Sequence, residues 1–329
     1  MLSVGPSVRR TSSLERLAGA PLGQGDKEID WTAPIDRSRW FFCETLTPLY
    51  YAPIYRELDR CHQRRYNQLT AMMANEIIAF MESEFLVTAL TAVASVKDDH
   101  QPADLRAAVR RFADDERRHA SIWWNLNRLS EPDWYRSKNR RLIRIPPGTT
   151  ATARCVGRHP VAVPLVFWLQ LVQEERSMEI SRRCMRVPAS TIEPRYVAAY
   201  SAHLPDEARH VQIDRHLIEH YYRHRGNAVR QISARLFTIF VRSLLVTPVH
   251  STTRVVRILA KEFPELTPLV PRMLRELKAL NHSVDYHEMM YSRSTTPVTF
   301  ALFDECPEFH RIRDVLLAYD PRPAGRPLR

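Results

Sequence analysis

Glycine, lysine and paired cysteine are scarce in this sequence of 329 residues. Only 8 glycines occur, and long stretches repeat their apolar residues every 3.6 positions, so a helical chain is favoured over a β architecture with many tight turns. The five cysteines are scattered without a C-x-x-C pair, so neither a zinc knuckle nor a disulfide framework is indicated. A reducing cytoplasm is therefore the expected compartment.

Long hydrophobic runs are also missing. The longest, VAVPLVFWLQLV, is too short to cross a bilayer, and the N-terminus lacks the apolar core of a signal peptide, so no membrane association is expected. The formal net charge of +11 comes almost wholly from arginine. Because no aromatic-and-basic stacking motif or helix-turn-helix pattern accompanies this charge, a nucleic-acid partner is not expected.

The apolar content of 44% is ample for a large core. Residues 1–36 are rich in Ser, Gly, Pro and Arg and predict a mobile tail. Residues 37–320 contain no linker-like segment and no repeat of fixed period, which predicts a single helical domain. Residues 321–329 are expected to form a frayed C-terminus.

Four predicted helices place acidic or imidazole side chains on apolar faces. They are YNQLTAMMANEIIAFMESEFLVTAL (66–90), DLRAAVRRFADDERRHASIWW (104–124), VPLVFWLQLVQEERSMEI (163–180) and YVAAYSAHLPDEARHVQIDRHLIEHYY (196–222). Burying one ionised carboxylate costs several kcal/mol even after relaxation. Several of them on inward faces therefore indicate a compensating partner: protons, arginines or a multivalent cation.

Two E-x-x-H motifs favour a multivalent cation over protons or arginines as this partner. Glu116 with His119, and Glu207 with His210, are each three positions apart, so each pair projects to one side of its helix. Two such helices facing each other, with one further glutamate from each of two other helices, form the carboxylate-bridged dinuclear site of di-iron helix bundles. The sequence therefore predicts a site for two metal ions.

The other two helices each offer more than one glutamate. Glu84 is favoured on the first, because it and Glu116 both lie about twelve residues from the loop that joins their helices, so they should share one height in the bundle. Glu76 and Glu82 remain alternatives to Glu84. On the third helix Glu175 is favoured, since it precedes His210 by the 35 positions that separate Glu84 from His119, and Glu174 remains its alternative.

Both motifs extend to D-E-x-R-H, beginning at Asp115 and at Asp206. Each aspartate is predicted to accept the second imidazole N–H of the opposite motif and so to fix that ring's orientation. A neutralisation of the acids by Arg118 and Arg209 alone is the alternative, but it gives the imidazoles no purpose. Pro205, between His203 and Glu207, removes a backbone N–H and predicts a local kink or bulge.

His203, four positions before Glu207, adds a third imidazole and completes the pattern H-x-x-x-E-x-x-H. With NEIIAFMESEF, the ERS that begins at Glu175, and IEPRYVAAYSAHLPDEARH, the sequence resembles the arylamine N-oxygenase family, the p-aminobenzoate N-oxygenase type of di-iron enzyme. The resemblance covers roughly Pro48 to His220. It implies an all-α, ferritin-like four-helix bundle with additional flanking helices.

The resemblance also implies a ligand set and an activity. Two iron ions would be bound by seven residues: Glu84, Glu116, His119, Glu175, His203, Glu207 and His210. Dioxygen on the reduced pair would give a peroxo-diferric species that N-oxygenates a small aromatic amine, as in the biosynthesis of secondary metabolites such as antibiotics. Ligands of oxygen and imidazole nitrogen without thiolate suit iron or manganese and do not exclude zinc, and iron is favoured.

Three further expectations concern partners and alternatives. The sequence contains no flavin, nicotinamide or iron–sulfur fingerprint, so an external electron donor or reductase is expected. A homodimer is expected from base rates alone. The alternative functions are a di-iron C-hydroxylase of a carrier- or tRNA-linked substrate and a non-enzymatic iron-binding or storage bundle.

Overall fold

A computed structural model describes residues 27, 29–95, 103–137, 139–159, 162–242 and 249–322. Within these ranges every regular element is helical, and the isolated β-bridge joins Trp40 to Ile192. The predicted all-α, ferritin-like fold is therefore confirmed.

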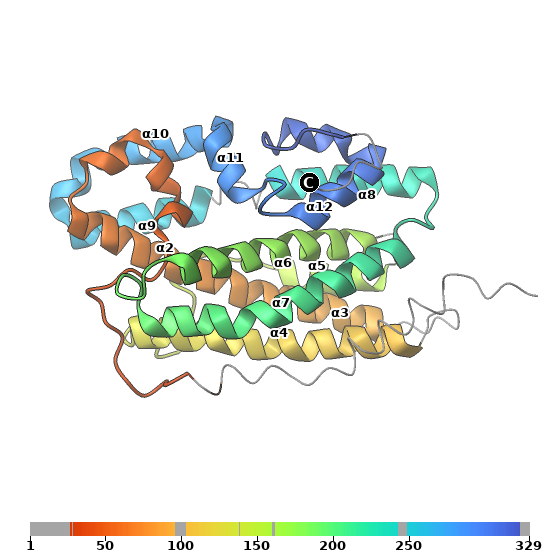
Figure 1. Ribbon diagram of the computed structural model, residues 1–329, viewed down its shortest axis with the longest axis horizontal. Coiled ribbons are helices and arrows are strands. Elements are labelled where there is room, and N and C mark those ends of the chain that lie inside the picture. The colour runs from red at the N-terminus through yellow and green to blue at the C-terminus, as the bar shows by residue number, and fades with distance from the viewer. Residues whose placement is uncertain are drawn as a thin grey trace, which may run out of the picture.

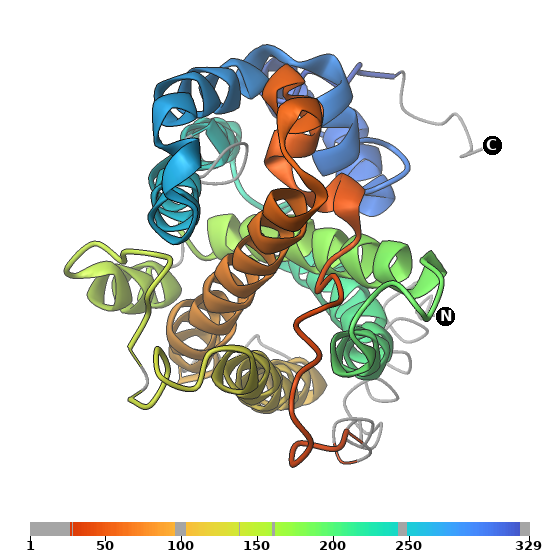
Figure 2. The same ribbon diagram turned by 90° about the vertical axis from the view of Figure 1, so that its left-hand side faces the viewer.

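Four long helical rods form a bundle (Figures 1 and 2). The first rod is composite: α2 (Arg60–Phe80) continues through the π-helical segment η5 (Met81–Leu86) into α3 (Val87–Ser95). The other rods are α4 (Ala103–Ser130), α6 (Val163–Arg186) and α7 (Pro194–Tyr221). The first rod packs against α4, α4 against α7, and α7 against α6, which brings the four acid-bearing stretches around one axis.

The remaining helices surround the bundle. Helix α5 (Thr149–Arg158) packs against α3 and α6. A second layer lies over the bundle, above it in Figure 1, and contains the later helices. These are α8 (Asn227–Phe240), α9 (Val249–Glu262), α10 (Val270–Ala279), α11 (Val284–Met290) and α12 (Pro297–Glu305). The short segments are η2 (Glu44–Leu46), η3 (Pro48–Tyr51), η4 (Pro53–Glu57), η7 (Pro264–Leu269), η8 (Leu280–His282) and η9 (Pro307–Asp314).

Local sequence explains how α7 begins. The side chain of Glu193 accepts hydrogen bonds from the backbone N–H groups of Arg195 (2.8 Å) and Tyr196 (3.3 Å), and Pro194 occupies the first helical position, where no N–H is needed. Farther along, the backbone stays α-helical across Pro205. The predicted bulge is therefore absent at Pro205, the kink stays a prediction, and a π-helical turn occurs instead in η5 of the first rod.

The N-terminal side of the domain begins earlier than predicted. Ile29, expected to belong to the tail, is buried, and Nε of Arg195 donates to the carbonyl oxygen of Asp30 (3.0 Å). Most of the predicted tail (residues 1–26 and 28) and of the predicted C-terminal segment (323–329) lies outside the described residues.

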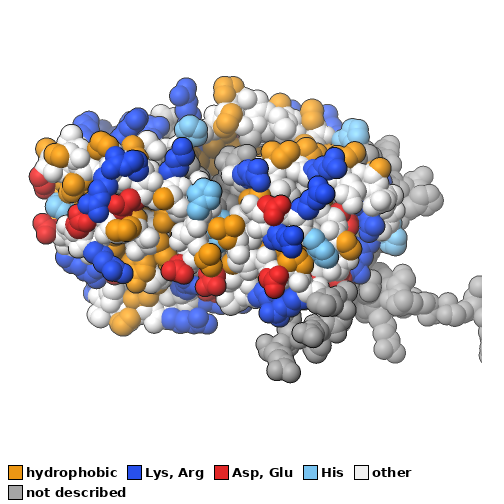
Figure 3. All heavy atoms as spheres, turned by 90° about the horizontal axis from the view of Figure 1, so that it is seen from above, with side chains coloured by type: hydrophobic (Ala, Val, Ile, Leu, Met, Phe, Trp, Pro, Cys, Tyr) orange, Lys and Arg blue, Asp and Glu red, His pale blue; other side chains and the backbone are white. Residues whose placement is uncertain are grey.

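The continuous rod Arg60–Ser95 is long and apolar enough, by length and composition, to cross a membrane. More than half of its most apolar stretch is buried among the other helices, as in the core helix of a bundle. On the face seen in Figure 3, Lys and Arg side chains are spread widely and alternate with acidic and apolar ones. The described Lys and Arg side chains on this face form no continuous stripe (Figure 3).

Candidate metal centre

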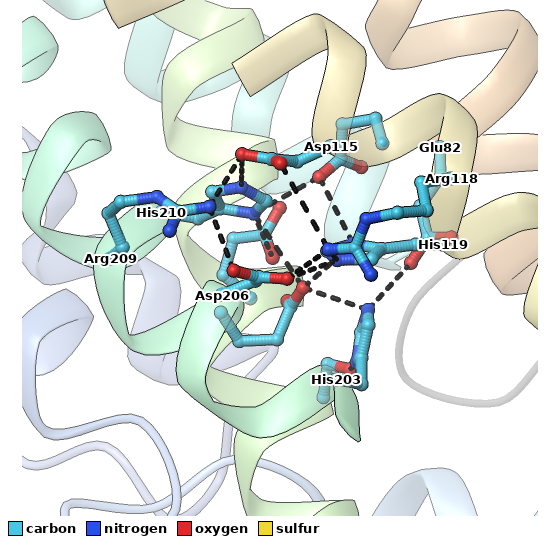
Figure 4. A network of polar contacts seen from close by, with 12 residues as sticks. Glu82, Asp115, Arg118, His119, His203, Asp206, Arg209 and His210 are labelled. Atoms are coloured by element: carbon cyan, nitrogen blue, oxygen red, sulfur yellow. Dashed lines mark hydrogen bonds and ion pairs between the residues drawn. The ribbon is translucent and has the colours of Figure 1, made fainter. Parts of the chain in front are cut away.

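Helices α4 and α7 present five of the predicted ligands to the bundle axis. His203, Glu207 and His210 follow one face of α7, and Glu116 and His119 follow the facing side of α4. Each of the five is at most 1% exposed. In Figure 4 the rings of His119, His203 and His210 gather around one network of polar contacts.

The contacts divide the centre into two overlapping groups. Nδ1 of His210 lies 3.1 Å from Oε1 of Glu116, and Nδ1 of His119 lies 3.3 Å from Oε1 of Glu207. In each group one ligand atom per residue lies within 4.8 Å of every other: Glu82, His119, His203 and Glu207 in one, and Glu116, His119, Glu207 and His210 in the other. Because the groups share His119 and Glu207, they suit two adjacent cations.

His203 enters the first group through its Nε2 atom. This nitrogen lies 2.8 Å from Oε1 of Glu207 and 3.3 Å from Oε1 of Glu82. On the other side of the ring, Nδ1 lies 3.3 Å from the hydroxyl of Ser177. A neutral ring protonated at Nδ1 and donating to Ser177 would leave Nε2 free to bind a metal.

Glu82, rather than the favoured Glu84, faces the other ligands. Glu82 is buried, and its Oε2 accepts a hydrogen bond from Nε1 of Trp123 (3.0 Å). The side chain of Glu84 is 41% exposed and forms an ion pair with Arg140. The prediction that Glu84 lies in the cluster is therefore wrong.

The error concerns the face of the helix and not the position along its axis. Glu82 and Glu84 differ by only about 3 Å along the axis, at about 1.5 Å per residue. The ring of Phe80, one turn before Glu84, also lies 5.3 Å from the guanidinium of Arg140, the partner of Glu84. This face of the first rod is therefore directed at the chain near residue 140. The π-helical turn, which changes the phase of the side chains within Met81–Leu86, gave no signal in the sequence.

The predicted ligand on α6 also requires a correction. Oε2 of Glu174 lies 3.7 Å from Nδ1 of His210, within the centre. The carboxylate of Glu175 points to α12, where it accepts hydrogen bonds from the backbone N–H groups of Val298 and Thr299 (2.7 Å each). Both glutamates are buried, so burial alone could not separate them, and the prediction that Glu175 faces the ligands is wrong.

Glu76, the other alternative on the first rod, is also buried away from the ligands. Its carboxylate accepts hydrogen bonds from the backbone N–H groups of Arg141, Leu142 and Ile143 and from the hydroxyl of Tyr135. These donors satisfy the charge without a metal. Glu76 therefore anchors the loop that follows α4.

The two aspartates of the D-E-x-R-H repeats lie where the repeats predict. Oδ2 of Asp206 is 3.2 Å from Nε2 of His119, and Oδ2 of Asp115 is 3.5 Å from Nε2 of His210. Each aspartate thus reaches the ring of the opposite motif (Figure 4). The arrangement leaves Nδ1 of both rings directed at the carboxylates of the centre.

Arg118 and Arg209 bind these outer aspartates. Arg118 forms an ion pair with Asp206, while Nη2 of Arg209 lies 2.5 Å from Asp115 and 2.9 Å from Asp206. Burial opposes the ionised form of Asp206, but the His119 ring and both arginines hold its pKa below the ordinary value. Neutralisation of the inner glutamates by arginine alone is therefore not what the structure shows.

Among the described residues, the four inner glutamates have histidines as their ion-pair partners and no arginine or lysine. Burial, reinforced by the charge of Glu174, raises the pKa of Glu116 to about 8, and burial with the charge of Glu207 raises the pKa of Glu174 to about 8. Burial lowers the pKa of His203 to about 3, so this imidazole is neutral. Burial opposes the charged form of His210, but the neighbouring carboxylates raise its pKa well above the ordinary value, and a metal at Nδ1 would take the place of that proton. Four carboxylates and three neutral imidazoles would then be balanced by two divalent cations.

Buried polar atoms without a hydrogen-bond partner also indicate that two cations fit this centre. Within the described part of the chain, the buried atoms without a hydrogen-bond partner include both carboxylate oxygens of Glu116, Oε1 of Glu207, Nδ1 of His119, Nδ1 of His210 and Nε2 of His203. Buried polar atoms are rarely left unsatisfied, and these six converge on one place. Their oxygen and imidazole chemistry suits iron or manganese.

A cavity of about 150 Å³ adjoins the centre. The side chains of Glu82, Glu174 and Glu207 form part of its wall, and most of the remaining lining is apolar. A small organic molecule in this cavity would therefore lie against the three carboxylates.

Comparison with protein families matches residues 11–267 to the family described as p-aminobenzoate N-oxygenase AurF. This range contains all four rods of the bundle and every residue of the centre. Comparison with individual curated proteins finds no match. Because the family match covers well over half of the 329 residues, the chain belongs to the p-aminobenzoate N-oxygenase family of oxygenases.

Proposed function

We propose that this chain is a non-haem di-iron N-oxygenase that acts on a small aromatic amine. The observation that carries the proposal is the buried cluster of four glutamates and three histidines beside a cavity, within a chain of the p-aminobenzoate N-oxygenase family. The family supports an amine as the substrate, and the cavity supports a molecule of the size of one aromatic ring.

Seven side chains would hold the two ions: Glu82, Glu116, His119, Glu174, His203, Glu207 and His210. Glu82 and His203 lie toward one position, Glu116 and His210 toward the other, and Glu207 lies between them. When bound, the iron pair would supply the activation of dioxygen and the redox chemistry of the reaction. His203 contributes a neutral donor that adds no charge to the four carboxylates.

The rest of the chain would control access and orientation. Apolar side chains around the cavity, such as Met73, Ile77 and Ile180, exclude water and confine a planar substrate. Asp115 and Asp206 hold the two rings of the E-x-x-H motifs in fixed orientations. Asp115 and Asp206 therefore position the metal ligands, and the cavity positions the amine.

The proposal also includes the identity of the metal, the source of electrons, the compartment, the oligomeric state and the biological role. Iron is favoured over manganese by the family, and electrons would come from an external donor or reductase. A cytoplasmic homodimer is proposed on the sequence arguments alone, and a biosynthetic role in secondary metabolism is proposed from the family.

The test is anaerobic reconstitution with ferrous iron, followed by dioxygen, an electron donor and 4-aminobenzoate. We expect two irons per chain and a hydroxylamine, nitroso or nitro product detected by mass spectrometry. A product hydroxylated on carbon would replace the proposal by the C-hydroxylase alternative. Ferrous iron that is oxidised and retained without any organic product would favour the storage alternative.

A further inference from the structure

Helix α8 presents a stripe of apolar side chains to solvent. Ile232, Leu236 and Ile239 are 50%, 45% and 61% exposed, and their spacing of four and three positions places them on one face of the helix. Among the described residues, seven large apolar side chains are exposed, and three of the seven lie in this α8 stripe. Apolar side chains that gather on one exposed face mark an interaction surface, whereas single ones do not.

The sequence around the α8 stripe carries charge of one sign only. From His220 to Lys261 the chain contains eight arginines and lysines and no aspartate or glutamate. Two of these arginines pair with glutamates from the C-terminal part of the domain. Arg235 and Arg242 occupy exposed positions along one edge of the stripe, and neither has an acidic side chain within 4.0 Å among the residues that the structure describes. The α8 surface is therefore apolar at its centre and basic at its edge.

Helix α8 lies one layer away from the metal centre (Figure 1). It packs on α6, the helix that carries Glu174. At the end of α8 the ring of Phe240 lies 6.3 Å from the ring of Phe85 in η5, three positions after Glu82. Because the axes of packed helices are only about 8–10 Å apart, a molecule bound on α8 would lie close to both rods that supply these two glutamates.

The charge and composition of the α8 surface select the kind of partner. A symmetric contact with a second copy of the chain would bring the same arginines together without any acid between them, so it is disfavoured. A helix that lies on an anionic lipid surface commonly inserts Trp or Phe, and no exposed position of α8 holds an aromatic residue. An apolar centre with a charged rim is the usual anatomy of a protein interface. An acidic protein therefore fits this surface best.

The proposed reaction requires such a partner. Insertion of one oxygen atom of dioxygen into an N–H bond, with release of the other atom as water, consumes two electrons and two protons. The sequence contains no flavin, nicotinamide or iron–sulfur fingerprint of its own. A carrier protein that delivers one electron must bind and leave twice in each reaction, and weak redox encounters of this kind use small interfaces and opposite charges.

We propose that the α8 stripe, with Arg235 and Arg242 at its edge, is the docking surface for an acidic one-electron carrier protein of the ferredoxin or flavodoxin class. Two reduced carriers, each oxidised by one electron, supply the two electrons, and water supplies the two protons. The need for electrons rests on the proposed function, whereas the docking surface rests on α8 itself.

The first test measures binding of an acidic [2Fe–2S] ferredoxin and of an acidic flavodoxin by isothermal titration calorimetry, with metal-free and with iron-loaded protein. We expect the affinity to fall at least 10-fold from low to high salt, because salt screens exposed charges. The double variant Leu236→Gln with Ile239→Gln should also bind at least 10-fold more weakly, since it removes the apolar centre. Val284→Gln, at a position on α11 that is 52% exposed, is the matched control and should stay within about twofold.

The second test measures how fast the iron-loaded protein oxidises reduced ferredoxin in a stopped-flow experiment. Arg235→Glu should lower the second-order rate constant at least 10-fold at low salt, and the difference should shrink at high salt. Arg110→Glu makes the same change of net charge at an exposed position of α4, and its effect should stay below about threefold. Reduction by a small viologen should be equal in all variants, which shows that the centre is intact.

Three results would overturn the proposal. The first is that neither acidic carrier binds the unmodified protein, or that both bind the α8 variants as tightly. The second is that the double variant turns a dimer into a monomer in sedimentation, which would make the stripe a contact between two copies. The third is that phosphatidylglycerol vesicles bind the chain through the stripe while carrier binding is unaffected by the double variant.

The proposed function can fail separately. A chain that accepts electrons through α8 but forms no N-oxygenated product from 4-aminobenzoate keeps the docking surface and loses the N-oxygenase activity. A chain that forms this product at the same carrier-driven rate in Arg235→Glu and in the double variant keeps the activity and loses the docking surface.

Discussion

At the scale of single residues, the position of a carboxylate on its helix decides whether it can bind metal. Glu82 and Glu84 are two positions apart, yet one contacts Trp123 and His203 and the other Arg140. We expect Glu82→Gln to bind iron at least 10-fold more weakly at one of the two positions, because it loses a charge and a ligand oxygen. Glu84→Gln should keep both irons.

The measurement is the number of irons retained per chain after dialysis against a weak chelator. Loss of iron from Glu84→Gln together with full retention in Glu82→Gln would contradict the assignment of Glu82.

Two adjacent aspartates on α4 allow a test of whether Asp115 orients the ring of His210. Asp115 is buried against His210 and Arg209, whereas Asp114 is 63% exposed and pairs with Arg117. We expect Asp115→Asn to weaken iron binding by about 10–100-fold, since partners that orient a metal-binding histidine have effects of this size. Asp114→Asn should change it by less than about twofold, because exposed ion pairs contribute little.

Competition with a coloured chelator gives the two affinities. Equal iron affinities in the two variants would show that Asp115 does not orient the His210 ring.

At the scale of the elements, one close contact fixes the position of α5. A Cβ atom at Gly157 would lie 2.5 Å from the carbonyl oxygen of Ala89 and 2.9 Å from Cβ of Ala92, both on α3. We expect Gly157→Ala to lower the free energy of unfolding by about 1–3 kcal/mol, because overpacking moves the backbone. This loss should exceed the gain of about 1 kcal/mol that alanine brings to a helix interior.

Gly226, just before α8, has open space around it and a φ of −59°, so Gly226→Ala is the matched control. Its unfolding energy in urea should stay within about 0.5 kcal/mol of the unmodified protein. A Gly157→Ala variant as stable as this control would show that α5 and α3 separate easily.

The elements also show why sequence patterns were sufficient for some residues only. The E-x-x-H pairs on α4 and α7 could be identified because both members of each pair must share a face at any helical phase. Glu174 and Glu175 are neighbours, about 100° apart on a helix buried on several sides, so the apolar pattern favours neither. The backbone N–H groups at the start of α12, more than a hundred residues away in the sequence, donate hydrogen bonds to Glu175.

At the scale of the whole molecule, the buried acids couple stability to pH and to metal. The ordinary pKa of glutamate is near 4.5, and in the metal-free fold those of Glu116 and Glu174 rise to about 8 through burial and mutual repulsion. Between pH 6.5 and 8 the folded protein therefore binds more protons than the unfolded chain, and its stability falls as the pH rises. Burial keeps His203 neutral in the folded protein, whereas its ordinary pKa near 6.5 leaves it partly protonated in the unfolded chain at pH 6.5, so its opposing contribution fades above about pH 7.5. Burial lowers the pKa of His119 in the same direction. Burial also opposes the charged form of His210, but Asp115 and the inner glutamates raise its pKa well above the ordinary value, so His210 adds to the fall in stability.

We therefore expect the Tm of the metal-free protein to fall from pH 6.5 to pH 8. The Tm of the protein loaded with manganese(II), a redox-stable substitute, should not fall in parallel, because the cations take the place of these protons. Thermal unfolding at three pH values, with and without metal, measures the difference. A metal-free Tm that rises over this range would contradict the protonation of the inner glutamates.

The sequence by itself determined the helical class, the four acid-bearing rods, the two E-x-x-H motifs with His203, and the outer aspartates, because each of these depends on spacing within one helix. Only the tertiary structure decided that Glu82 and Glu174 face the ligands and that Glu76 and Glu175 hold backbone N–H groups. The physical reason is that a helix buried on several sides carries no polar face of its own. The surfaces packed around it decide which of its charged groups meets a metal or a loop.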